Sequence, residues 1–330
     1  MKLRNNSGED SQERSQVSRK GPPGDADGSG DLPARANAAT IKLMYSELIQ
    51  IETSRVRPRR PDWLKVRIPG GENYFELKRL IHGLDLHTVC ESARCPNIGE
   101  CWGHRTATFM ILGDLCTRRC GFCAVPKGLP STVDWGEPER VAQAAAKMGL
   151  RYVVVTSVDR DDQKDGGSTM FALTIVALRR QIPGVKVEVL IPDFHGSDEA
   201  LEAVLHAQPD VLNHNTETVP RLYNVARKGS RYERSLRLLA RAREIAPQIP
   251  TKSGLMVGLG EAFEEVVEVL KDLSAAGVGI VTIGQYLRPS GQQLPVARFY
   301  TPDEFAALRE AGVRCGIKHV ESGPLVRSSY

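Results

Sequence analysis

The chain of 330 residues lacks the features that mark membrane, secreted and nucleic-acid-binding proteins. No apolar run approaches the ~18 residues that a membrane helix needs. The first ten residues contain no apolar core, so they do not resemble a secretory signal, and their acids argue against a mitochondrial transit peptide. The net charge is only +4, and no long basic stripe interleaved with aromatic residues indicates nucleic acid. We therefore expect a protein that binds neither membrane nor nucleic acid.

Cysteine is present in an unusual arrangement, because six of the seven cysteines lie in two groups of three. The group that we call the loop triplet has the spacing C-x3-C-x2-C and follows an apolar run: Cys116, Cys120 and Cys123. The group that we call the N-terminal triplet has the spacing C-x4-C-x5-C: Cys90, Cys95 and Cys101. Many thiols in a chain without a visible signal sequence favour a reducing compartment, and we expect the cytoplasm.

Each triplet has the ligand chemistry of a metal centre. Thiolates are soft ligands that select iron–sulfur clusters, zinc or copper(I). A [4Fe–4S] cluster normally takes four cysteines, so three ligands on one short loop leave one iron open for a small molecule. Zinc is the alternative, either as a knuckle on the loop or as two sites that mix the triplets and recruit His87 or His104. Three disulfides are a weaker alternative, since a chain of this size does not need disulfide bonds to stabilise its fold.

The loop triplet, with Phe122 before its last cysteine, resembles the C-x3-C-x-Φ-C motif of radical S-adenosylmethionine (SAM) enzymes. The two triplets together, in this order and spacing, resemble the lipoyl synthase family. The resemblance extends over residues 45–330 and is carried by five stretches of sequence: 86–90, 95–102, 156–162, 213–219 and 327–330.

The resemblance implies an activity. Lipoyl synthases insert two sulfur atoms, at C6 and C8, into an octanoyl chain that is amide-linked to a lysine of a lipoyl carrier domain. In this reading the loop triplet holds a [4Fe–4S] cluster that binds and cleaves SAM, and the N-terminal triplet holds a second [4Fe–4S] cluster that donates sulfur. Ser328, in the terminal Arg-Ser-Ser-Tyr motif, is implied as the fourth ligand of this auxiliary cluster.

The resemblance also implies partners and cofactor contacts. The expected partners are an octanoylated carrier domain (the glycine-cleavage H protein or a 2-oxoacid dehydrogenase E2), a flavodoxin or ferredoxin reductant, and an iron–sulfur carrier that rebuilds the auxiliary cluster. Adjacent glycines such as Gly166 and Gly167 are, from sequence alone, better explained as a turn. The residues that the resemblance places at SAM are Phe122, Thr156, Ser157, Asp159, Gly166, Gly167, Asn213, Asn215, Glu217, Arg234, Gly258 and Gly260.

The order of elements predicts an α/β fold. Short Val/Ile/Leu-rich stretches that do not alternate cleanly are typical of buried parallel strands, and we expect six: 108–112, 152–157, 186–191, 210–214, 252–257 and 279–283. Helical stretches lie between them: 138–148, 169–181, 198–207, 231–245 and 263–276. Units of strand and helix in series indicate a parallel barrel or an open sheet. The resemblance selects a partial (β/α)6 barrel of the TIM type, in which active sites lie at the C-terminal ends of strands.

We divide the chain into four segments. Residues 1–37 form a breaker-rich tail that is expected to be disordered, and residues 38–105 carry the N-terminal triplet after helices at 38–51 and 76–86. Residues 106–302 form the radical SAM barrel, and residues 303–330, with a helix at 303–311, close on the auxiliary cluster.

Three questions stay open at this level. The basic run 55–67 is either a solvated segment or a docking surface for an acidic partner, and the first is favoured. Cys315 stands apart from both triplets and is expected to be a buried, inert thiol. The rival functions are another radical SAM enzyme whose auxiliary cluster transfers electrons, and a non-catalytic zinc-binding interaction module.

Overall fold

The computed structural model describes residues 60–66, 68–104, 106–130 and 132–329. Pro58–Tyr330 forms one compact unit. The predicted tail 1–37, the predicted helix 38–51 and most of the basic run 55–67 lie outside the described residues. Of that run, Arg60 is exposed and Lys65 forms an exposed ion pair with Asp62 at 2.9 Å.

In the described part of the chain, eight strands form a single sheet in sequence order, β1 to β8. The first pair, β1 and β2, is antiparallel, and every later pair is parallel. Among the described residues β1 and β8 do not pair with each other, so the sheet is an open, partial barrel. The strands are β1 (His87–Thr88), β2 (Thr108–Ile111), β3 (Tyr152–Ser157), β4 (Lys186–Leu190), β5 (Val211–Asn213), β6 (Thr251–Val257), β7 (Ile280–Gln285) and β8 (His319–Gly323).

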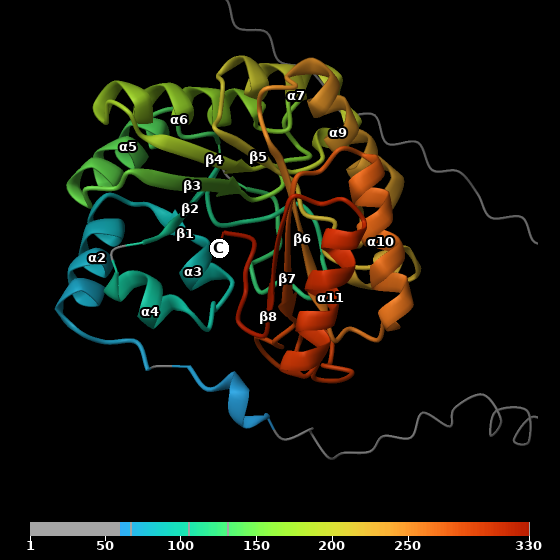
Figure 1. Cartoon of the computed structure of the whole chain (residues 1–330). Helices are drawn as coiled ribbons and strands as arrows, with labels where there is room; N and C mark the ends of the chain where they lie inside the picture. Colours follow the sequence, from blue (N-terminus) through green and yellow to red (C-terminus); the bar gives the residue numbers. More distant parts are fainter. Residues whose placement is uncertain (1–59, 67, 105, 131, 330) are drawn as a thin grey trace, which may run out of the picture. The chain divides into compact units, whose positions relative to one another are not determined.

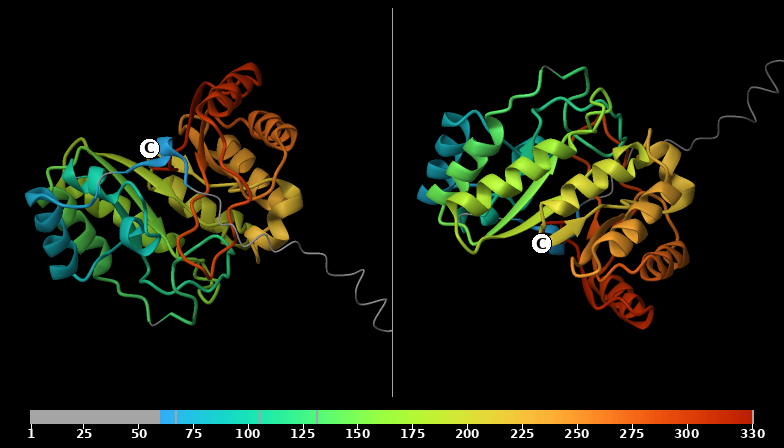
Figure 2. Two further views of the ribbon diagram at one scale, coloured as in Figure 1. Left: turned by 90° about the horizontal axis from the view of Figure 1, so that it is seen from below. Right: turned by 90° about the horizontal axis from the view of Figure 1, so that it is seen from above.

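Helices α5 to α11 follow the strands and cover the outer face of the sheet (Figures 1 and 2). Three short helices and α2 precede the barrel: η1 (Asp62–Leu64), α2 (Glu72–Gly83), α3 (Val89–Ser92) and α4 (Ile98–Gly103). The helices that cover the sheet are α5 (Glu137–Lys147), α6 (Ser168–Gln181), α7 (Asp198–His206), α9 (Tyr232–Ile245), α10 (Phe263–Ala275) and α11 (Pro302–Arg314). Short turns complete the loops: η2 (Phe194–Gly196), η3 (Pro220–Leu222) and α8 (Tyr223–Ala226).

Local sequence explains several element boundaries. Ser197 caps α7, because its hydroxyl accepts a hydrogen bond from the Ala200 amide at 3.1 Å. Thr301 and Glu304 form a capping box at the start of α11. All four residues of β2 are buried, as expected of a strand covered on both faces. The predicted α/β fold is thereby confirmed, with each of the six predicted strands present.

The structure also contains elements that the prediction did not include. β8 continues the parallel sheet inside the segment 303–330 that we expected to form only a helix and a closing tail. Its sequence, His-Val-Glu-Ser-Gly, has one buried apolar residue, Val320, and therefore no strand-like apolar run. Of the N-terminal triplet, Cys90 lies on the short helix α3 and Cys101 on α4, and Cys95 lies between the two helices. No helix in the described part of the chain is long and apolar enough to cross a membrane.

Candidate functional site

A cavity of about 200 Å³ lies on the inner side of the sheet, and segments from distant parts of the sequence line it. The residues that line it include Cys90 and Cys95 of the N-terminal triplet, Cys123 of the loop triplet, and Ser328. Most of the remaining lining is apolar, with Val89, Leu255, Met256, Leu287 and Val326 among it. Residues of both triplets and of the C-terminal segment thus meet at one cavity.

The loop triplet sits on a loop that neighbouring segments hold by main-chain hydrogen bonds. The Cys116 amide donates to the Pro126 carbonyl at 2.9 Å, and the Thr117 amide donates to the Asp159 carbonyl at 3.1 Å. Gly121 donates to the Ala226 carbonyl at 2.9 Å and accepts from the Leu294 amide at 3.0 Å. The loop therefore follows β2 at the C-terminal edge of the sheet, where the sequence predicted it.

Gly121 is a position where the loop needs a glycine. A Cβ atom there would lie 2.7 Å from the Val225 carbonyl oxygen and 3.0 Å from the Leu294 side chain. Such a separation is well inside van der Waals contact, so the loop reaches this close packing only without a side chain.

The N-terminal triplet lies against the C-terminal segment. The Asn97 side-chain amide, between Cys95 and Cys101 in sequence, donates to the Leu325 carbonyl at 2.8 Å. Burial lowers the pKa of Arg327, and the nearby Cys95 thiol acts in the opposite direction. In Figure 1 the last described residues run back between α3 and strands β6 and β7. Ser328 is thereby placed in the same cavity as Cys90 and Cys95.

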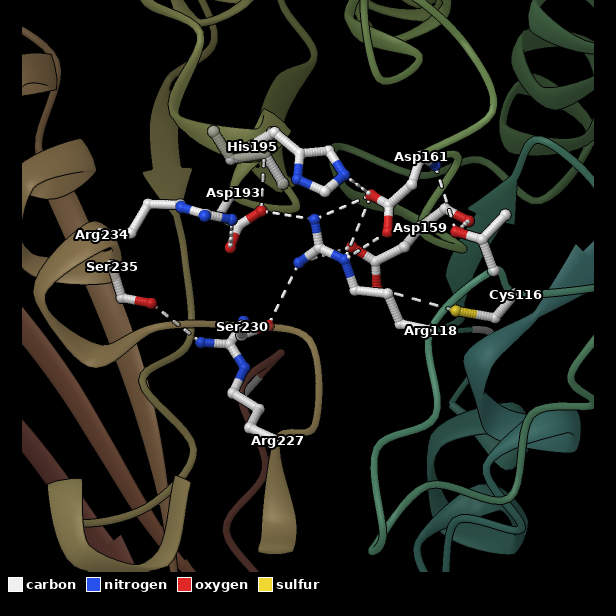
Figure 3. Close-up of polar contacts among 12 residues, drawn as sticks. Cys116, Arg118, Asp159, Asp161, Asp193, His195, Arg227, Ser230, Arg234 and Ser235 are labelled. Atoms are coloured by element: carbon white, nitrogen blue, oxygen red, sulfur yellow. Dashed lines mark hydrogen bonds and ion pairs between the residues drawn. The ribbon is translucent and has the colours of Figure 1, made fainter. Parts of the chain in front are cut away.

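Arg118, inside the loop triplet, is the centre of a buried ion-pair network (Figure 3). Its Nε and Nη2 atoms donate to the two Asp161 oxygens, each at 2.8 Å. Nη2 also donates to Asp193 Oδ1 at 2.6 Å, and Nη1 lies 3.3 Å from Asp159 Oδ1. Arg234 Nη1 lies 3.3 Å from the other Asp193 oxygen. The network ties the cysteine loop to the ends of β3 and β4.

The charges of this network follow from its contacts. Burial acts against ionisation of Asp193, but the Arg118 guanidinium holds the pKa of that carboxyl well below its usual range. Burial raises the pKa of Asp159 despite Arg118. Burial also raises the pKa of the Cys116 thiol to about 11 and that of Cys120 to about 12. Loading of a metal centre would therefore release protons from these thiols.

Arg227 is a second buried guanidinium beside the loop. Its Nη1 donates to the Ser235 hydroxyl at 3.0 Å and to the Tyr223 hydroxyl at 3.1 Å. The residue is 8% exposed. Its positive charge opposes the rise in the pKa of Cys120 that burial causes. The loop triplet thus lies next to a fixed cation.

Comparison with known proteins assigns the family. A model of the N-terminal domain of lipoyl synthase of the radical SAM family matches residues 2–95, and a model of the radical SAM superfamily matches residues 110–273. The lipoyl synthase of Koribacter versatilis is 60% identical over 288 residues, which are 87% of this chain and 95% of that protein. The lipoyl synthase of Rubrobacter xylanophilus is 58% identical over 285 residues, 86% of this chain and 89% of that protein.

The chain belongs to the lipoyl synthase family. Among solved structures, methylornithine synthase aligns over 64% of this chain and 70% of its own, with 15% identity and a TM-score of 0.48, a likeness too low to carry an argument. Membership in this radical SAM family implies SAM and [4Fe–4S] clusters as cofactors.

The donor sets fit such cofactors. All seven cysteines are free thiols, and those of the N-terminal triplet are close enough to influence one another's pKa values. Among the described residues no three Cys, His, Asp or Glu side chains converge on a point for a single metal ion. A cubane differs from such an ion because its ligands are spread over separate irons. Asn215, which lines the cavity, has a buried Oδ1 atom without a partner among the described residues, as a ligand-binding group would.

Some of the predicted cofactor residues line the cavity, and others form hydrogen bonds within the protein. Phe122, Asn215 and Glu217 line it. Thr156 donates to the Leu190 carbonyl at 2.8 Å, and Asn213 donates to Glu188 at 2.9 Å. The other predicted residues are not among those that line the cavity: Cys101, Cys116, Cys120, Ser157, Asp159, Gly166, Gly167, Arg234, Gly258 and Gly260.

The predicted glycines pack against protein atoms. A Cβ atom at Gly166 would lie 2.9 Å from the Phe194 ring, and one at Gly258 would lie 2.6 Å from the Arg298 carbonyl oxygen. All four predicted glycines have positive φ: Gly166, Gly167, Gly258 and Gly260. Their contact with SAM stays a prediction.

Sequence reasoning missed Arg118, Asp193 and Arg227 as parts of the site. Arg118 lies within the cysteine loop, and Asp193 lies three residues beyond the end of β4, so position alone indicated both. Arg227 carries no such signal, because its place beside Cys120 depends on how α8 packs on the loop.

Proposed function

We propose that this chain is a lipoyl synthase that inserts two sulfur atoms, at C6 and C8, into an octanoyl chain amide-linked to a lysine of a lipoyl carrier domain. The observation that carries the proposal is the single cavity lined by Cys123, by Cys90 and Cys95, and by Ser328. An eight-carbon chain requires apolar surroundings, and the cavity has them. Unactivated carbon–hydrogen bonds are inert to side-chain acids and bases, so a bound cofactor must supply the chemistry.

In this proposal Cys116, Cys120 and Cys123 hold a [4Fe–4S] cluster whose open iron takes SAM. When bound, that cluster and SAM supply the hydrogen-abstracting radical. The chain's own residues position the ligands: Arg118 ties the loop to β3 and β4, and Ala226 and Leu294 fix the main chain at Gly121. Phe122, Asn215 and Glu217 are proposed to contact SAM from the cavity wall. Thr156, Ser157, Asp159, Asn213, Arg234 and the four glycines remain weaker proposals for this role.

The N-terminal triplet and Ser328 are proposed to hold a second [4Fe–4S] cluster, which donates the sulfur. Support comes from the contact of Asn97 with Leu325 and from the position of Ser328 in the cavity. A serine oxygen is a harder ligand than a thiolate and matches iron less well. This weaker match suits an iron that must be released when the cluster gives up sulfur.

The family acts on lipoyl carrier proteins in general, and the finer partners are proposals. They are the glycine-cleavage H protein or a 2-oxoacid dehydrogenase E2 as substrate, a flavodoxin or ferredoxin as reductant, and an iron–sulfur carrier for repair. The cytoplasmic location also stays a prediction.

The test separates the roles of the two triplets. We expect replacement of Cys116, Cys120 and Cys123 by alanine to abolish 5′-deoxyadenosine formation, because SAM then has no open iron. Replacement of Cys90, Cys95 and Cys101 should leave some SAM cleavage but no thiolated product. The measurement is anaerobic incubation of reconstituted protein with SAM, dithionite and an octanoyl-lysine peptide, followed by mass analysis for added sulfur.

Thiolated product from the variant that lacks the N-terminal triplet would contradict the sulfur-donor assignment and favour an auxiliary cluster that transfers electrons. Iron and sulfide analysis tests the zinc alternative. Two cubanes require about eight irons per chain, whereas a zinc module would contain zinc and no sulfide.

A further inference from the structure

Three exposed cations lie in the loop triplet and in the segment that follows α8: Arg119 in the loop, and Lys228 and Arg231 in the segment. None of them forms an ion pair with another described residue. Glu233 is an exposed acid close to Arg231 in sequence, and with it the local net charge remains positive. We call Arg119, Lys228 and Arg231 the rim cations.

The rim cations come from two segments that contact each other. Arg118 Nη1, next to Arg119, donates to the Ser230 hydroxyl at 3.1 Å. A Cβ atom at Gly229 would lie 3.8 Å from the Arg118 side chain. Ser230 and Gly229 lie between Lys228 and Arg231 in sequence, so each of the three cations is a neighbour in sequence of a residue in this contact (Figure 3 shows Ser230 at Arg118).

This contact lies directly on the loop that carries Cys120. The Gly121 amide donates to the Ala226 carbonyl at 2.9 Å, and Val225 approaches Gly121 from the same side. The Val225 side chain is nevertheless 59% exposed. An exposed apolar residue among arginines is typical of a protein–protein contact surface.

We propose that the rim cations and Val225 form the docking surface for an acidic, one-electron carrier protein. The proposal rests on the proposed function, since SAM cleavage at the loop triplet needs an electron from outside the chain. The carrier is oxidised by one electron, and SAM accepts it as its carbon–sulfur bond breaks to methionine and a 5′-deoxyadenosyl radical. A carrier bound to residues 225–231 would contact a segment that is itself hydrogen-bonded to the loop triplet, through the Gly121 amide and the Ala226 carbonyl.

Charge complementarity argues for this occupant. Unpaired cations raise the association rate of an acidic partner and do so most strongly at low ionic strength. A neutral or basic partner gains nothing from them. The same cations leave the SAM site itself unchanged, because they are exposed while the network around Arg118 is buried.

The experiment reverses these charges in the full-length reconstituted protein. The test variant is Arg119→Glu/Lys228→Glu/Arg231→Glu. The matched control, Lys147→Glu/Arg151→Glu/Lys318→Glu, has the same net charge and changes exposed cations at the opposite edge, at the end of α5 and before β3 and β8. The rate of 5′-deoxyadenosine formation is measured with dithionite and with a reduced acidic flavodoxin.

With dithionite, both triple variants should match the wild type. With flavodoxin, kcat/KM of the test variant should fall by about tenfold or more at low salt, and its dependence on ionic strength should flatten. The control variant should stay within about twofold of the wild type. The neutral variant Arg119→Gln/Lys228→Gln/Arg231→Gln, which disturbs the fold less, should lie between wild type and the test variant.

Equal flavodoxin rates in the test and control variants would overturn the proposal. So would an equal loss with dithionite and flavodoxin in both the reversed and the neutral variants, because the cations would then act on the site and not on docking. The readout is 5′-deoxyadenosine, so it does not depend on sulfur insertion. Failure of the proposed function would appear separately, as SAM cleavage without thiolated product in the wild type.

Discussion

Glu137 is a buried carboxyl group at the turn that leads from β2 into the cysteine loop. Its Oε2 accepts a hydrogen bond from the Leu112 amide at 2.7 Å. Leu112 has a φ of 70°, which is unusual for a residue with a side chain. Burial raises the pKa of Glu137 to about 7, although the amides of Leu112 and Gly113 act in the opposite direction. The stability of this turn is therefore expected to depend on pH through the carboxyl group of Glu137.

We expect the free energy of unfolding to fall as pH rises from about 4.5 to about 7. In this window the unfolded chain ionises Glu137 while the folded chain keeps it protonated, so the folded state binds more protons. The shift corresponds to about 3 kcal/mol. Glu137→Gln keeps an acceptor for the turn and should remove this part of the pH dependence. Urea unfolding of metal-free, reduced protein at several pH values measures it.

The exposed Glu264→Gln serves as the control and should leave the pH profile unchanged. Parallel profiles for wild type and Glu137→Gln would show that Glu137 does not titrate in this window.

Single residues differ in how far sequence can identify them. The cysteines were identifiable because their spacing is itself the chemical requirement. Glu137 and Arg227 were not, because their burial arises from helices packing on the loop, which no local pattern encodes. Arg118 is intermediate, since its place in the loop is visible but its three carboxylate partners come from two other strand ends.

At the scale of elements, the contact between β7 and the C-terminal segment decides where Ser328 lies. Gly284 in β7 leaves room for this segment, because a Cβ atom there would overlap the Val326 carbonyl oxygen and lie 3.1 Å from Arg327 Nη1. Asn97 holds the segment from the other side through Leu325. The segment is thus held between a strand and the N-terminal triplet.

Gly284→Ala should displace this segment from the cavity. The auxiliary cluster would lose a ligand and be depleted, so iron should fall from about eight toward about four per chain. SAM cleavage should persist, because the loop triplet does not contact Gly284. Gly279→Ala is the matched control, since its nearest neighbour would be the Thr251 carbonyl oxygen at 4.0 Å. Full iron content and normal product in Gly284→Ala would show that Ser328 is not needed at the cluster.

Elements were predicted well where apolar runs were long. The six predicted strands are largely buried beneath the helices that cover the outer face of the sheet, and their Val/Ile/Leu content reflects that burial. β8 was missed because it lies at the sheet edge with a polar sequence. Only the family resemblance predicted that the C-terminal segment meets the N-terminal triplet. Contacts between residues far apart in sequence leave no local sequence pattern.

At the scale of the whole molecule, one largely buried network joins neighbouring strands of the open barrel. Lys252 Nζ lies 3.1 Å from Glu188 Oε1, and both side chains are 3% exposed. Tyr152 donates to Glu188 at 2.6 Å, and the Asn213 amide donates to Glu188 at 2.9 Å and to the Ser328 carbonyl at 3.2 Å. Strands β3 to β6 and the C-terminal segment therefore share one charged centre.

Lys252→Met should destabilise the whole unit, because Glu188 would keep a buried charge without this cation. Breaking one partner of a buried pair costs about 3–5 kcal/mol, and urea unfolding measures it. The double variant Lys252→Met/Glu188→Gln should recover part of the loss, since it removes the uncompensated charge. The amide oxygen can still accept a hydrogen bond from Asn213, while the amide NH2 can donate to the Tyr152 hydroxyl. A cost below about 1 kcal/mol for Lys252→Met would mean that water reaches the network. The double variant should then be no more stable to urea than Lys252→Met alone.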